Sequence, residues 1–207
     1  MPAVLQADAL LPALAPWRNA PRWWLGLSGG LDSTVLLDLL VQLAEDRRLP
    51  PLHAIHIDHQ LQADAPHWRQ HCEALCAELG VPLTSRRVSV GESGEGPEAA
   101  ARAARYRVFE NLLGRGELLL LAHHLDDQVE TFFLRLMRGA GARGLAGMPV
   151  SRPLGQGALL RPLLATQREA IHAHALARRL RWQEDASNRN PDFDRNFLRR
   201  QVLPLLA

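Results

Sequence analysis

The chain alternates short, almost purely apolar runs with longer stretches in which apolar residues recur every three or four positions. The short runs predict β-strands at residues 22–27, 52–57, 81–90, 117–122 and 158–164. The longer stretches predict helices at residues 33–47, 66–79, 98–113, 126–138 and 166–180. Strands that alternate with helices of this length indicate an α/β fold. Because the strand runs lack a polar face, we expect a doubly wound parallel sheet of about five strands with helices on both faces.

The carboxyl ends of parallel strands meet at one edge of such a sheet, and ligands bind there near a switch in strand order. Polar segments follow three of the predicted strands, at residues 28–33, 57–61 and 122–127. We therefore expect the functional site on this rim. Beyond residue 180 the pattern becomes polar and rich in arginine. We expect one domain over residues 1–180 and an extension of loop and short helix over residues 181–207.

The segment SGGLDS, residues 28–33, joins the first predicted strand to the first helix. Gly29 and Gly30 allow the backbone to turn tightly and to approach a ligand closely. The amides that follow lie at a helix N-terminus, which favours an anion, and the hydroxyls of Ser28 and Ser33 can add donors. A nest of this kind can hold a pyrophosphate without the lysine of a GxxxxGK[ST] loop, and the chain contains no lysine.

Asp32 is the unusual member of this segment, because a carboxylate repels phosphates unless a cation lies between them. Its presence predicts a Mg²⁺ ligand. The alternative is that Asp32 caps the helix and the glycines only form a turn. All six residues together, at a strand-to-helix junction, favour the phosphate site.

A second polar cluster, LAHHLDDQVET, occupies residues 121–131. Asp127 and Glu130 are three positions apart and share one face of a helix that begins at the rim. Their carboxylates suit the helix dipole and could also bind a cationic amine. His123 and His124 point to opposite sides at a strand end, and no third ligand is evident. We therefore expect hydrogen bonding from these histidines rather than a metal centre.

The composition is that of an ordinary globular chain, with 47% of 207 residues hydrophobic and 22% charged. The net charge is only +2 although 24 residues are arginine, so a nucleic-acid partner is permitted but not required. The N-terminus lacks a basic region before its apolar residues, and no apolar stretch approaches the length of a membrane span. We expect a cytoplasmic protein that does not contact a membrane.

Six segments occur in order along the chain: SGGLDS (28–33), EAAARAARY (98–106), LAHHLDDQVET (121–131), RLMRGAGARGLAGM (135–148), RPLL (161–164) and D-x-SN…RN-x-x-R (185–199). The first resembles the pyrophosphate loop of the N-type ATP pyrophosphatases, or PP-loop superfamily. The ordered set resembles the tRNA(Ile)-lysidine synthetases and covers nearly the whole chain. The resemblance implies an adenine nucleotide alpha-hydrolase-like fold of the PP-loop ATPase type.

The resemblance implies ligation of free lysine to C2 of cytidine 34 in the CAU anticodon of tRNA(Ile). ATP first adenylates the base with loss of pyrophosphate, and the lysine amine then displaces AMP. ATP and Mg²⁺ are the implied cofactors, and tRNA(Ile) and lysine are the implied partners. The oligomeric state stays open, with a homodimer as one option. Family members continue into C-terminal tRNA-binding domains, which we expect to be absent from this chain.

The resemblance also implies a role for individual residues. Those expected to bind ATP are Ser28, Gly29, Gly30, Leu31, Asp32, Ser33 and Ile57. Those expected to take part in catalysis are Asp32, Arg102, Asp127, Arg195 and Arg199. Asp127 and Glu130 are expected to bind the substrate lysine, and which of them accepts a proton is left open. The glycine-rich segment 138–148 is expected to be either a loop over the site or a linker.

Three other classes of protein would also be compatible with the SGGLDS loop. A tRNA thiolation enzyme would need reactive cysteines, whereas Cys72 and Cys76 lie on a predicted helix and are expected to be small core residues. An enzyme like asparagine synthetase would need a glutamine-hydrolysing partner domain. A non-catalytic ATP-binding module would have no need of Asp32, Asp127 and Glu130.

Overall fold

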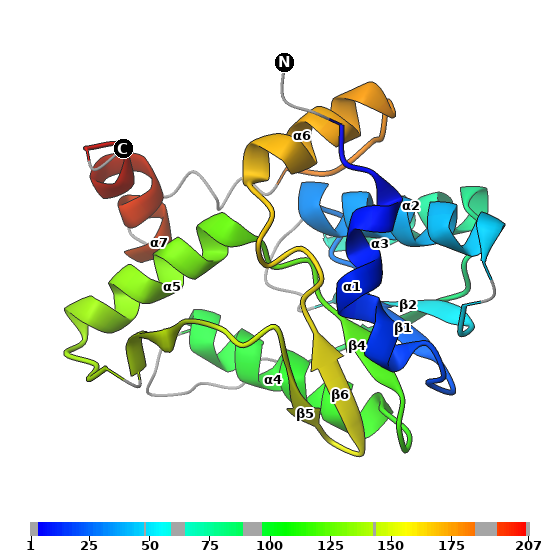
Figure 1. Ribbon diagram of the computed structural model, residues 1–207, viewed down its shortest axis with the longest axis horizontal. Coiled ribbons are helices and arrows are strands. Elements are labelled where there is room, and N and C mark those ends of the chain that lie inside the picture. The colour runs from blue at the N-terminus through cyan, green and yellow to red at the C-terminus, as the bar shows by residue number, and fades with distance from the viewer. Residues whose placement is uncertain are drawn as a thin grey trace.

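The computed structural model describes residues 4–47, 49–58, 65–88, 97–142, 144–184 and 194–205 (Figure 1). Its centre is a six-stranded sheet with the order β3-β2-β1-β4-β6-β5. The strands are β1 (Trp23–Gly26), β2 (Leu52–Asp58), β3 (Leu83–Arg87), β4 (Leu118–Leu120), β5 (Ser151–Leu154) and β6 (Gly157–Leu160). All neighbouring strands are parallel except β5 and β6. The predicted α/β class and doubly wound sheet are confirmed.

The helices of the described residues follow the predicted pattern and include additional short turns at both ends of the chain. The α-helices are α1 (Leu11–Leu14), α2 (Leu31–Asp46), α3 (Ala65–Glu78), α4 (Pro97–Leu112), α5 (Leu125–Met137), α6 (Arg168–Ala177) and α7 (Asp194–Phe197). Shorter turns are η1 (Ala7–Leu10), η2 (Ala15–Trp17), η3 (Gly144–Ala146), the π-turn η5 (Leu198–Val202) and η6 (Leu203–Leu205). None of the helices in the described part of the chain is both long and apolar enough to cross a membrane.

Successive strand residues enter opposite layers of the core. In β1, Trp23 and Leu25 pack with α2, α3 and α6, whereas Trp24 packs with Phe109 of α4 on the other face. This alternation follows from the pleat of a strand, and it explains why the central strands β1 and β4 are apolar on both faces. Figure 1 shows α4 across the sheet from α2 and α3, while α5 extends from the end of β4 toward α7.

The strand that the sequence did not predict is β5, which makes the sheet six-stranded rather than five-stranded. Its sequence, Ser-Arg-Pro-Leu, contains Pro153 and is mostly exposed, so it lacks an apolar run. Proline is accommodated because β5 is an edge strand. The turn to β6 uses Gly155, whose φ is +54° and whose added Cβ would lie 2.5 Å from the carbonyl oxygen of Glu110.

A buried polar network joins α2 to α6 beneath the sheet. Asp38 is 3% exposed and accepts hydrogen bonds from His174 Nε2 (2.8 Å) and Arg178 Nη2 (3.2 Å). His174 also donates through Nδ1 to the carbonyl oxygen of Leu5 at 3.1 Å. Burial alone would raise the pKa of Asp38, but the hydrogen bonds and charges of His174 and Arg178 hold it below its usual value. The network therefore fixes α6 and the N-terminal segment on α2.

Replacing Asp38 with Asn removes the charge from this network and leaves its partners poorly compensated. We expect Asp38→Asn to lower the free energy of unfolding by about 3 kcal/mol. Urea-induced unfolding monitored by circular dichroism measures this. The matched control is Asp8→Asn, because Asp8 pairs with Arg47 at 3.0 Å on the exposed surface, where such a pair contributes less than about 1 kcal/mol.

The same network gives a pH dependence of known sign. A carboxyl group with a lowered pKa in the folded state stabilises the fold above the ordinary carboxyl pKa of 3.8. That contribution is lost as the pH falls through the lower pKa of the folded protein. The stability difference between the wild type and Asp38→Asn should therefore shrink below about pH 4. A difference that stays constant down to about pH 3 would contradict this assignment.

Candidate active site

The loop between β1 and α2 depends on one glycine in a left-handed conformation. Gly29 has φ of +82°, and an added Cβ would lie 2.9 Å from Cys72 Sγ on α3. Gly30 has an ordinary extended conformation and forms the N-cap of α2. The loop thus turns against α3 and directs the first amides of α2 toward the rim at the carboxyl ends of the strands.

Two serine hydroxyls hold this loop in shape. Ser33 donates to the carbonyl oxygen of Gly30 (3.1 Å) and accepts from the backbone N–H of Ser28 (3.2 Å). In the 2.9 Å contact between the two hydroxyls, Ser28 is therefore the donor. The sequence predicted that these hydroxyls could serve a phosphate, whereas the structure uses both protons within the loop. The donors that a helix N-terminus leaves without an internal partner are here the amides of Leu31, Asp32 and Ser33, because the Gly30 amide donates to Ser28 Oγ at 3.2 Å.

Asp32 lies on the first turn of α2 beside these amides. Its Oδ1 is buried and has no hydrogen-bond partner in the described part of the chain, and its Oδ2 lies 3.7 Å from His124 Nε2. Burial raises the pKa of Asp32 above its usual 3.8 and Asp127 adds to this, while His124, Arg168 and Arg199 oppose it. A cation at this carboxylate would favour its ionised form.

His124 is the residue around which the acids gather. It is 1% exposed and precedes α5, where its backbone N–H donates to Asp127 Oδ2 at 3.0 Å. Its Nε2 is 3.7 Å from Asp32 Oδ2 and 3.6 Å from Asp127 Oδ2, and its Nδ1 is 3.7 Å from Asp126 Oδ1. Carboxylates from two motifs, on α2 and α5, therefore meet at one buried imidazole.

Glu130 lies one turn further along α5 and is paired with an arginine from the end of the chain. Arg199 Nε donates to Glu130 Oε1 at 2.6 Å, and Glu130 is 1% exposed. Burial works against the charge of Arg199, but Glu130, Asp127 and Asp32 together raise its pKa. The structure thus brings Arg199 to the predicted acids. The lysine-binding role of Glu130 stays a prediction, and in this structure its Oε1 is occupied by Arg199.

The remaining predicted site residues are on β2, α4 and α7. Ile57 is 8% exposed near the end of β2. Arg102 is exposed on α4, with its Cζ 5.1 Å from the ring centroid of Tyr106. Arg195 belongs to α7, but its side chain lies outside the described residues, as does the whole turn at 185–188.

Two residues that the sequence did not single out also reach the site. Arg168, exposed at the start of α6, lowers the pKa of Asp32, and its backbone N–H donates to Asp126 Oδ1 at 3.3 Å. The backbone N–H of Gln183 donates to the carbonyl oxygen of Gly29 at 2.9 Å. Arg168 begins the helix that follows β6, so the strand-end rule that located the other segments could have indicated it. Nothing in the local sequence indicates Gln183.

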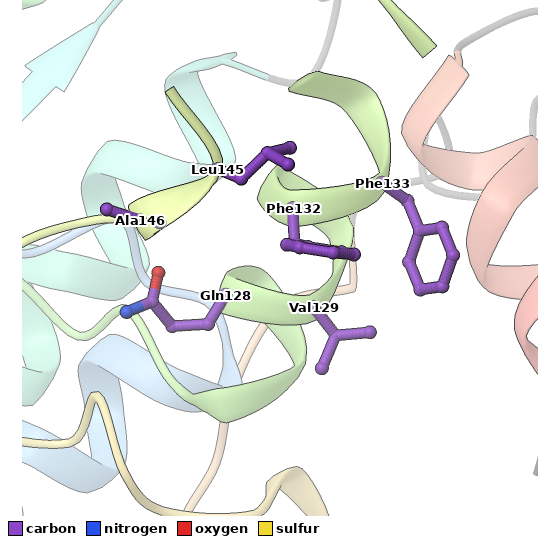
Figure 2. A pocket seen from close by; sticks show the side chains of 7 residues that line it. Gln128, Val129, Phe132, Phe133, Leu145 and Ala146 are labelled. Carbon is purple, nitrogen blue, oxygen red and sulfur yellow. The ribbon is translucent and has the colours of Figure 1, made fainter. Parts of the chain in front are cut away.

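The glycine-rich segment after α5 is anchored to that helix in its described part. Gln128 donates to the carbonyl oxygen of Met148 (2.8 Å) and accepts from its N–H (2.6 Å). Between α5 and η3 lies a hollow of about 370 Å³, in which Phe132 and Leu145 lie near each other (Figure 2). Its lining contains no charged side chain. The hollow therefore offers no group to pair with a phosphate.

No three His, Cys, Asp or Glu side chains within the described ranges are arranged to hold a metal ion by themselves. A hard cation such as Mg²⁺ is commonly held by one or two carboxylates together with substrate phosphates. Asp32, with its buried and unpaired Oδ1 beside a helix N-terminus, fits that arrangement.

Comparison with known proteins identifies a family. The family model of the PP-loop domain matches residues 4–206. The tRNA(Ile)-lysidine synthase of Pseudomonas aeruginosa is 57% identical over 207 residues, which is 100% of this chain and 47% of that protein. The corresponding enzyme of Xanthomonas campestris pv. campestris is 50% identical over 204 residues, covering 98% of this chain and 46% of that protein. The chain spans about half the length of these curated relatives, and the resemblance predicted from its motifs is confirmed.

Solved structures share the fold at low sequence identity. The U34-tRNA thiolase NcsA from Methanococcus maripaludis, solved with its 4Fe–4S cluster, has a TM-score of 0.70 at 16% identity, covering 97% of this chain and 77% of that chain. An NMN synthetase from Francisella tularensis has a TM-score of 0.55 at 13% identity, covering 94% and 87%. At these identities the likeness establishes the fold alone.

The loop geometry makes a prediction that needs no ligand. Gly29→Ala would force a side chain into a left-handed conformation against Cys72, whereas Gly30→Ala meets no atom closer than 3.4 Å. We expect Gly29→Ala to lower the free energy of unfolding by about 1–2 kcal/mol more than Gly30→Ala. Urea unfolding of both variants measures the difference, and equal losses would mean that the loop does not require the left-handed glycine.

Proposed function

The chain belongs to the PP-loop domain family, and from that premise we propose that it carries the catalytic centre of a tRNA(Ile)-lysidine synthase. The observation that supports this most is the meeting of Asp32 and Asp127 at His124, beside the N-terminus of α2. That arrangement sets an anion-binding loop next to carboxylates that suit a cationic amine. The proposed substrates are ATP, free lysine and a tRNA(Ile) with a CAU anticodon, which places the reaction in the cytoplasm.

In the first proposed step, the amides at the start of α2 bind the phosphates of ATP. The C2 oxygen of cytidine 34 attacks the α-phosphorus, so that an oxygen–phosphorus bond forms and the bond to pyrophosphate breaks. Asp32 would hold Mg²⁺, which supplies positive charge to offset the phosphates. Arg199 and Arg168, whose charges already act on Asp32, stabilise the negative charge that accumulates as pyrophosphate leaves.

In the second step, the ε-amine of lysine attacks C2 and AMP departs with its oxygen. A carbon–nitrogen bond forms, a carbon–oxygen bond breaks, and the amine loses a proton. Asp127 is the better placed of the two predicted acids to accept this proton. Its side chain is 15% exposed, whereas that of Glu130 is 1% exposed and paired with Arg199. Asp127 is therefore assigned as the base, and Glu130 fixes Arg199.

The two cysteines favour this proposal over sulfur transfer. Cys72 and Cys76 are 0% and 1% exposed. Burial raises the pKa of the Cys72 thiol to about 12 and that of the Cys76 thiol to about 11. A thiol must ionise to act as a nucleophile or ligand, so both behave as core residues.

The direct test is transfer of labelled lysine to a CAU-anticodon tRNA(Ile) transcript with ATP and Mg²⁺, with AMP and pyrophosphate followed together. We expect label in the RNA and equal amounts of both products. The control is the same RNA with a GAU anticodon, which lacks cytidine 34. Pyrophosphate release without lysine in the RNA would contradict lysine as the nucleophile. ATP binding without any pyrophosphate release would support a non-catalytic module instead.

Substitutions of the two central carboxylates should block different steps of the reaction. Asp32→Asn should stop pyrophosphate release, because it removes the charge that holds the cation at the phosphates. Asp127→Asn should lower lysine transfer by about 100-fold or more while ATP binding is retained. Glu73→Gln is the control, because Glu73 is exposed on α3 and its ion pair with Arg69, at 3.6 Å, lies on the surface of that helix. Equal loss of ATP binding and lysine transfer in Asp127→Asn would overturn its assigned role.

A further inference from the structure

A cluster of arginines surrounds Tyr106 on the α4 side of the sheet. Arg102, from the same helix, has its Cζ 5.1 Å from the Tyr106 ring centroid, and Arg152 from β5 has its Cζ at 5.2 Å. Burial would raise the pKa of Tyr106, but the charges of Arg102, Arg161 and Arg105 and a hydrogen bond with Arg161 outweigh it and lower the pKa. The aromatic ring thus holds guanidinium groups from two separate elements in one place.

Arg161 lies beneath this cluster, immediately after β6. It is 3% exposed, its Nη1 donates to the carbonyl oxygen of Pro149 at 2.8 Å, and its Nε is buried without a partner in the described part of the chain. Burial lowers its pKa, and the nearby charges of Arg152 and Arg102 contribute to this although Tyr106 opposes it. A buried guanidinium without a carboxylate partner is costly. An anion at this position would offset that cost.

His123 is subject to the charges of both the cluster and the proposed catalytic centre. This residue follows β4 and immediately precedes His124, and its Nδ1 is buried without a partner among the described residues. Burial lowers the pKa of His123 to about 3 and the arginines add to this, although Asp127 opposes it. His123 is therefore a neutral imidazole on which the charges of Arg161, Arg102 and Asp127 all act.

The chemistry of the cluster selects a phosphate as the anion. Guanidinium groups present planar pairs of donors that match phosphate oxygens. The position of the cluster separates it from the loop proposed for ATP. That loop follows β1, whereas Arg161 follows β6, which is two strands away in the sheet. An RNA strand that delivers a base to Asp127 has further phosphates along its backbone, and these can reach the cluster.

We propose that Arg102, Arg152 and Arg161 form a second phosphate subsite, which binds a backbone phosphate of the RNA next to the nucleotide that reacts. Arg102 and Arg152 meet the phosphate directly, because they flank Tyr106 and are more exposed than Arg161. Arg161 adds positive charge from beneath. The inference rests on the proposed function, since it assumes that the substrate is an RNA.

The test compares Arg152→Gln with the wild type by direct binding of a labelled CAU-anticodon tRNA(Ile) transcript at several salt concentrations. We expect the RNA affinity to fall by about tenfold and the slope of log affinity against log salt to decrease by about one. The affinity for ATP, titrated separately, should stay unchanged. Arg115→Gln is the matched control, because Arg115 is exposed before β4, at the opposite end of that strand, and should bind RNA like the wild type.

The RNA affinity of Arg161→Gln is measured in parallel. Its thermal unfolding is measured as well, because substitution of a buried residue can lower the stability of the fold. Unchanged RNA affinity in Arg152→Gln, or an equal loss in Arg115→Gln, would overturn the subsite. A loss of ATP affinity with RNA affinity retained would assign the phosphate to the nucleotide and also overturn it. Because RNA binding is measured without lysine transfer, a subsite that fails can be distinguished from a proposed function that fails.

Discussion

The contact of one buried histidine with three carboxylates is the constraint on which the rest of the site depends. His124 lies at the end of β4, and Asp32, Asp126 and Asp127 approach it to within 3.6–3.7 Å from two helices. Ionised carboxylates that gather around one side chain repel one another unless a positive or hydrogen-bond-donating group lies between them. Asp126 also accepts from the first amide of α6. Side chains from α2 and α5 and the first amide of α6 thus come together around this imidazole.

Around this centre, both positive and negative groups act on the carboxylates. Arg199 and Arg168 act on Asp32 from the C-terminal segment and α6. On the α4 side, Arg102 and Arg161 of the cluster around Tyr106 lower the pKa of His123, whereas Asp127 opposes this. In the proposed function, the carboxylates in the middle bind the amine, and the positive groups bind phosphates. Electrostatic preorganisation of this kind is usually a large part of enzyme catalysis.

The sequence predicted those features that depend on local chemistry. Apolar runs located five of the six strands, and the strand-end rule placed SGGLDS and the acids of 121–131 on one rim. The edge strand β5 was missed because Pro153 and exposed residues conceal it. The pair of Glu130 with Arg199 joins residues that are 69 positions apart, and Arg168 lies in none of the recognised motifs. Such partners are chosen by tertiary packing, which a periodic pattern does not encode. The internal use of the Ser28 and Ser33 hydroxyls likewise depends on the exact turn of the loop.

The central claim is that ATP cleavage and amine attack occur at one centre through an adenylated RNA. The most direct test is incubation of the chain with tRNA(Ile) and ATP labelled at the α-phosphorus, without lysine. We predict that label becomes attached to the RNA and is released as AMP when unlabelled lysine is added. Release of pyrophosphate with no label on the RNA, before or after the addition of lysine, would contradict it.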